Sequence, residues 1–161
     1  MTERILQQIE RCSDPKLLRQ WASNAAKQGA TEIELAARRR LYAVMPSAQP
    51  GTLEFDVWQS IYALEDALTS ERGKTTRLSR TRQKIGRDGE QRTVADLVMG
   101  KPSEGFRMLI DRGLPELTFE ALAIKHEKVF GSLIAATARE RLAEAGVGQE
   151  FLAGLQSQES R

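Results

Sequence analysis

Several residue types on which common functions depend are scarce in this chain of 161 residues. It contains one cysteine, Cys12, and one histidine, His126. A single cysteine cannot form an internal disulfide, which agrees with a reducing compartment. One cysteine and one histidine are too few for a zinc site of ordinary composition. We therefore expect neither a metal site nor another cofactor.

Long apolar runs are also missing. No stretch approaches the ~18 apolar residues of a membrane-spanning helix. The N-terminal stretch M-T-E-R-I-L-Q-Q-I-E-R lacks the apolar core of a signal peptide. We expect a cytoplasmic protein that does not enter a membrane.

The sequence has no sustained alternation of β-branched or aromatic residues, so it gives no strand signal. Helix formers dominate instead. The prediction is an all-α, single-domain bundle of about eight to nine helices, because this length suits one domain. The central helix is expected at 52–71, where apolar residues recur every three or four positions. They are Leu53, Val57, Ile61, Leu64 and Leu68.

The best candidate boundary is 46–52, where two prolines and a glycine stand among small polar residues. We expect a small N-terminal three-helix unit at 1–46 and a main helical domain at 52–147. A tail at 148–161 is expected to add one helical turn at 151–155 and then to fray.

Positive charge is concentrated in one segment, 72–92. This basic segment holds eight lysines and arginines and two acids, so it carries +6, whereas the whole chain carries +2. The remaining residues therefore carry −4. A local basic patch on a mildly acidic scaffold is typical of a protein that grips a polyanion.

A helix starting at Thr75 or Thr76 and reaching about Ile85 would arrange these charges. At about 100° per residue, four cations fall within an arc of about 80°. These four are Arg77, Arg80, Lys84 and Arg87. The only large apolar residues of this helix, Leu78 and Ile85, lie on its flank and would hold it against the core. Arg82 lies on the far side of that line and is expected to reach an acid of the 52–71 helix.

The hypothesis is nucleic-acid binding, since regularly spaced cations can follow backbone phosphates. DNA is preferred over RNA because the segment lacks the exposed aromatic residues of a single-strand RNA reader. A homodimer would present two such helices, although no heptad run supports one. The predicted nucleic-acid-binding residues are Lys74, Arg77, Arg80, Arg82, Lys84, Arg87, Arg92, Thr76 and Gln83.

Two alternatives use the same residues differently. The basic segment could dock an acidic partner protein, or it could be a solvated or internally paired face. A third function, as a metal-dependent nuclease component, would use Glu116 and Glu120, which share a helix face four residues apart. His126 is expected at a helix end on the surface. G-K-T-T at Gly73 lacks the first glycine of a P-loop, because Leu68 stands there. These observations favour a binding protein over an enzyme.

Overall fold

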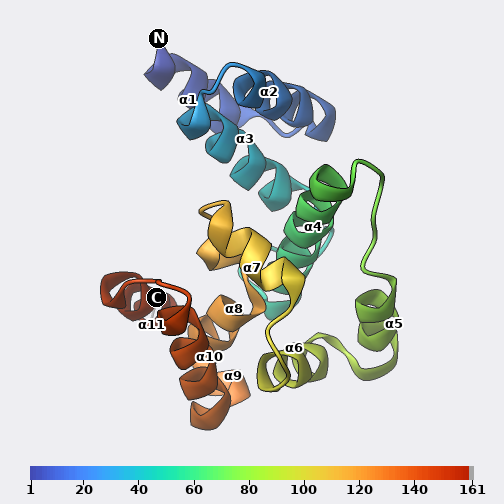
Figure 1. Ribbon diagram of the computed structural model, residues 1–161, viewed down its shortest axis with the longest axis vertical. Coiled ribbons are helices and arrows are strands. Elements are labelled where there is room, and N and C mark those ends of the chain that lie inside the picture. The colour runs from blue at the N-terminus through green and yellow to red at the C-terminus, as the bar shows by residue number, and fades with distance from the viewer. Residues whose placement is uncertain (160–161) are drawn as a thin grey trace. The chain divides into compact units, whose positions relative to one another are not determined.

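The computed structural model describes residues 1–159, which form eleven α-helices and one 3-10 helix, with no strand among them (Figure 1). The all-α prediction is confirmed. Within this described part, no helix combines the length and the apolar character needed to cross a membrane. The chain forms two compact units, Met1–Ser47 and a second that starts at Ala48.

The expected number of eight to nine helices is wrong for two reasons. A short helix, α9 (Glu127–Phe130), follows α8 (Phe119–Lys125) after a break at His126. The tail forms a full helix, α11 (Gln149–Glu159), rather than one turn, because Leu152 and Leu155 are both buried and α11 packs on α8. The predicted fraying of the last residues falls partly on 160–161, which lie outside the described residues.

The first unit consists of α1 (Thr2–Arg11), α2 (Pro15–Lys27) and α3 (Thr31–Val44). Asp14 caps α2 by accepting a hydrogen bond from the Lys16 amide at 2.9 Å, and Pro15 occupies the first helical position. Both α1 and α2 pack on α3. Arg40 Nε donates to the Cys12 carbonyl at 2.8 Å and fastens α3 to the end of α1.

The second unit is built around α4 (Leu53–Arg72), which packs on three other helices and on η1 (Pro115–Leu117). Thr52 caps its start and Gly73, with φ 71°, ends it in the left-handed conformation. The predicted apolar stripe is confirmed, because its last four members are all buried. The three helices on α4 are α6 (Glu90–Met99), α7 (Glu104–Asp111) and α8. The helix α10 (Ser132–Glu144) covers α8.

The basic segment forms α5 (Ser79–Asp88), which begins later than expected. Neither Thr75 nor Thr76 caps it. The Thr76 amide donates to Thr69 Oγ1 at 2.9 Å and the Leu78 amide donates to Glu65 Oε2 at 2.9 Å. Side chains of α4 thus satisfy backbone donors that a helix N-terminus would otherwise leave open, and 73–78 stays non-helical.

A single residue, Gly89, separates α5 from α6. Its backbone has φ 87° and ψ 167°, a region that glycine alone occupies readily. The chain therefore changes direction at one residue, and α6 contacts α5.

This turn predicts that alanine substitutions at two nearby glycines, Gly86 and Gly89, change the free energy of unfolding in opposite directions. We expect Gly89→Ala to lower the free energy of unfolding by about 2 kcal/mol, because alanine must adopt a strained backbone. Gly86→Ala is the matched control, since Gly86 lies inside α5 with open space around its Cβ position. There alanine should raise the free energy of unfolding by about 0.5 kcal/mol through its helix propensity. Urea unfolding of both variants measures the difference, and equal effects would contradict the turn geometry.

Candidate functional site

The basic segment is anchored to the central helix by Arg82. Its Nε and Nη2 atoms donate to Glu65 Oε2 and Oε1 at 2.8 and 2.7 Å. The same guanidinium lies 5.2 Å from the ring centroid of Trp58 and 5.8 Å from that of Tyr62, both on α4. The hydrogen bonds to Glu65 raise the pKa of Arg82 against an opposing effect of burial. The expectation that Arg82 reaches an acid of the 52–71 helix is confirmed, so it is a structural residue.

Lys84 is also paired, contrary to the expected open stripe. Its Nζ lies 3.0 Å from Asp88 Oδ2 and 2.7 Å from Asp96 Oδ2. Hydrogen bonds with Asp96 and Asp88 raise the pKa of Lys84. Asp96 comes from α6, which the one-residue turn at Gly89 places beside α5. Lys84 therefore joins two helices rather than extending the row of open cations.

The two uncharged candidates differ. Thr76 already makes two hydrogen bonds within the protein. Its amide donates to Thr69 Oγ1, and its hydroxyl donates to the Lys74 carbonyl at 3.0 Å. Gln83 is exposed on α5. It shares a helix face with Arg80 and Arg87, which lie three residues before it and four after it. Only Gln83 of this pair is placed to contact a large ligand.

Six cations of the segment remain exposed, and we call five of them, all except Arg72 with its ion pair to Glu104, the open cations. They are Lys74, Arg77, Arg80, Arg87 and Arg92. The Arg87 and Arg92 side chains are 68% and 71% exposed, and their nearest carboxylate contacts, to Asp88 and Asp96, are long at 3.4 and 3.5 Å. Within residues 1–159, Lys74, Arg77 and Arg80 have no acidic partner. Exposed ion pairs at such distances contribute little to stability, so all five open cations are available to an anion.

A buried carboxylate that sequence reasoning missed lies at the other end of α4. Asp56 Oδ2 accepts hydrogen bonds from Lys125 Nζ at 3.0 Å and lies 2.7 Å from His126 Nε2. His126 lies at the end of α8 as expected, but its side chain is only 15% exposed, so the expected surface position is wrong. Burial alone would raise the pKa of Asp56, but the bonds to His126 and Lys125 outweigh it and lower the pKa. The one sequence signal was an acid between the apolar residues Phe55 and Val57.

The two acids of the nuclease hypothesis do not share a helix face as expected, because Glu116 lies in η1 and Glu120 in α8. Glu120 is buried, and its Oε2 accepts a hydrogen bond from Arg141 Nη1 at 2.7 Å. Arg141 also donates to the Gly100 carbonyl. Burial raises the pKa of Glu120 although the bond to Arg141 opposes it. Among the described residues no group of three or more histidine, cysteine, aspartate or glutamate side chains could hold a metal ion.

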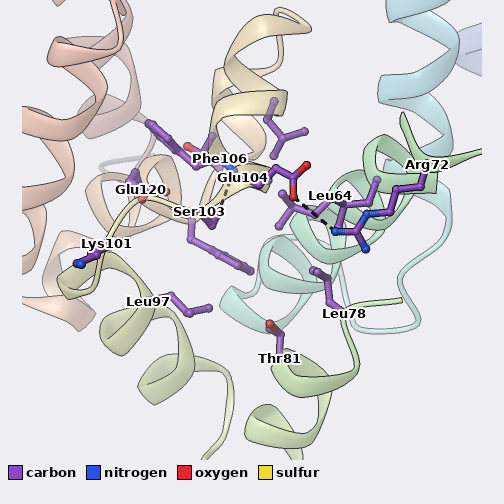
Figure 2. A pocket seen from close by; sticks show the side chains of 15 residues that line it. Leu64, Arg72, Leu78, Thr81, Leu97, Lys101, Ser103, Glu104, Phe106 and Glu120 are labelled. Carbon is purple, nitrogen blue, oxygen red and sulfur yellow. Dashed lines mark hydrogen bonds and ion pairs between the residues drawn. The ribbon is translucent and has the colours of Figure 1, made fainter. Parts of the chain in front are cut away.

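A cavity of about 250 Å³ lies among α4, α5, α6, α7 and α8 of the second unit (Figure 2). Most of its lining is apolar. Polar groups at its edge include Arg72, Thr81, Lys101 and Glu104. Arg72 Nη2 lies 3.5 Å from Glu104 Oε2, an ion pair in which both side chains are well exposed. No sequence pattern indicated this cavity, because its walls come from five separate elements.

Comparison with known proteins gives no family for this chain. No protein-family model matches it, and neither a curated protein nor a solved structure is similar to it.

Proposed function

We propose that the chain binds nucleic acid, and DNA in preference to RNA, through its open cations. The observation that carries the proposal is that Lys74, Arg77 and Arg80 lack an acidic partner among the described residues, while Arg82 beside them is fixed to α4. Uncompensated cations favour a polyanion, because each phosphate that they neutralise releases a condensed counterion.

The anchoring of α5 supports this proposal. Ile85 is buried and Leu78 is half-buried, and the bonds to Glu65 hold the same helix on α4. Arg80, Gln83 and Arg87 then project from one exposed face of a fixed helix. A ligand that binds there orders only the side chains, which lowers the entropic cost of association.

The preference for DNA follows from the exposed side chains. The large apolar residues at the surface of residues 1–159 include no aromatic ring. Proteins that read single-stranded RNA stack bases on exposed aromatic rings. Arginine-rich faces without such rings suit the phosphates of a duplex. The same cations would also suit an acidic protein surface, and binding experiments with duplex DNA and with an acidic protein distinguish the two functions.

The test compares duplex DNA binding by the wild type and by an Arg77→Gln, Arg80→Gln, Arg87→Gln variant. We expect affinity at about 50 mM salt to fall at least ~10-fold and the slope of log affinity against log salt to become about 2.7 smaller, since three phosphate contacts are lost. Fluorescence anisotropy over a salt series measures both quantities.

The control removes the same charge elsewhere, by Arg4→Gln, Lys16→Gln and Lys27→Gln, all exposed in the first unit. It should change affinity by less than about 3-fold. If the two triple variants lost affinity for duplex DNA equally, net charge alone would explain the loss. No binding of the wild type to duplex DNA at about 50 mM salt would refute the proposal, and binding to an acidic protein under the same conditions would favour the alternative.

A further inference from the structure

The cavity of the second unit has the size and the lining of a small-molecule site. Leucines and phenylalanines from four helices form most of its wall, with Leu78 completing it from the segment before α5. These residues are Leu64, Leu68, Leu97, Phe106, Leu109 and Phe119. An engineered apolar cavity of about 150 Å³ binds benzene. A volume of about 250 Å³ therefore leaves room for a molecule with one or two rings.

Two polar groups point into this space without a strong partner (Figure 2). The Arg72 guanidinium faces the cavity, and its contact with Glu104 Oε2 is long at 3.5 Å. The Thr81 hydroxyl points toward the cavity from α5 and has no hydrogen-bond partner among residues 1–159. Ligand pockets commonly combine an apolar wall with a few such groups, which fix the orientation of the ligand.

The charges of the lining favour an anion. Two acids line the cavity, Glu104 and Glu120, and Glu120 is neutralised by Arg141 at 2.7 Å. Two cations, Arg72 and Lys101, stand against the remaining carboxylate of Glu104. A ligand carboxylate could replace Glu104 as the partner of Arg72, and arginine binds carboxylates through two parallel hydrogen bonds.

We propose that this cavity binds a small apolar carboxylate of one or two rings, whose carboxylate is held by Arg72 and Thr81. The ring system lies against the leucine and phenylalanine wall, where the burial of its apolar surface contributes to affinity. Glu104 is a competitor for Arg72 in this site. The proposal does not depend on nucleic-acid binding.

The experiment uses the full chain and two probes that differ in one group, 2-naphthoate and the neutral 2-naphthalenemethanol. Isothermal titration calorimetry should show that the wild type binds the acid at least ~10-fold more tightly, the size of one charge-assisted contact. Arg72→Gln should abolish this difference and leave the binding of the alcohol unchanged. Glu104→Gln should strengthen the binding of the acid, because the competing carboxylate is removed.

Two further variants test whether both probes bind in this cavity. Lys27→Gln in the first unit removes a cation outside the cavity and should leave both affinities unchanged. Leu97→Trp narrows the cavity from α6 and should weaken both probes, with circular dichroism to check that the helices persist. Failure of the wild type to bind 2-naphthoate, equal affinity for the acid and the alcohol, or unchanged binding in Leu97→Trp would each overturn the proposal.

Discussion

Replacing Asp56 with alanine is expected to lower the free energy of unfolding by about 3 kcal/mol at about pH 7. Asp56 is 7% exposed and accepts from Lys125, which is 30% exposed, while His126 Nε2 lies 2.7 Å away. Removing the Asp56 carboxylate leaves the Lys125 ammonium and the largely buried His126 imidazole without their acidic partner. The loss should lie at the lower end of the range for buried pairs, because water can still reach Lys125.

The destabilisation should depend on pH with a definite sign. The pKa of Asp56 is lowered by folding from its ordinary value of 3.8. A depressed pKa contributes stability that is present above 3.8 and is lost as the pH falls through the lower, folded value. The gap between wild type and Asp56→Ala should therefore be full at about pH 7 and should shrink below about pH 4.

The control is Glu54→Ala, an exposed acid in the same first turn of α4. Both acids interact with the helix N-terminus, which favours negative charge by about 0.5 kcal/mol. Glu54→Ala should lower the free energy of unfolding only by that amount. Urea unfolding between about pH 3 and pH 7 measures the free energy of unfolding of both variants. A loss below about 1 kcal/mol for Asp56→Ala, or one that does not change with pH, would show that this cluster does not stabilise the fold.

The second buried carboxylate contributes differently. Burial raises the pKa of Glu120, so folding disfavours its charged form even with Arg141 beside it. A raised pKa contributes stability that is present at low pH and is lost as the pH rises through the folded value. Asp56 and Glu120 therefore oppose each other in the dependence of stability on pH. In the Asp56→Ala variant the pH dependence that remains from Glu120 should therefore have the opposite sign.

The sequence predicted features that depend on neighbours along one helix. The apolar stripe of α4 follows from the helical period, and the reach of Arg82 to α4 follows from its position opposite Arg80 and Arg87 on α5. These features need only the geometry of one helix and one adjacent surface. That is why the anchoring of the basic segment could be predicted before its precise start was known.

Features that depend on a turn between helices or on distant pairing could not be predicted in the same way. Lys84 appeared open because Asp96 belongs to the next helix, which the turn at Gly89 places in contact with α5. The burial of Asp56 could not be predicted because its partners lie 69 and 70 residues away. A polar residue is buried only where tertiary structure supplies its partner, and helical periodicity contains no information about that partner.

The anchor of the basic segment is tested by Glu65→Ala, which is expected to lower the free energy of unfolding by about 3 kcal/mol. The Glu65 side chain is 11% exposed and accepts three hydrogen bonds, two from Arg82 and one from the Leu78 amide. Their loss should also raise the hydrogen-exchange rate of the Leu78 amide toward that of an open segment. Glu71→Ala, at an exposed position of the same helix, should change stability by less than about 0.5 kcal/mol.

The same variant separates two physical accounts of the proposed DNA binding, because it changes charge and order in opposite directions. Glu65→Ala raises the net charge of the chain from +2 to +3 and releases the Arg82 guanidinium. If affinity depended on net charge alone, it would rise, as it should in Glu71→Ala, which carries the same added charge. If the fixed position of α5 governs affinity, Glu65→Ala should bind duplex DNA several-fold more weakly than Glu71→Ala, since the segment must then be ordered on binding. We expect the second result, because the open cations Arg80 and Arg87 are placed by the helix that Glu65 holds.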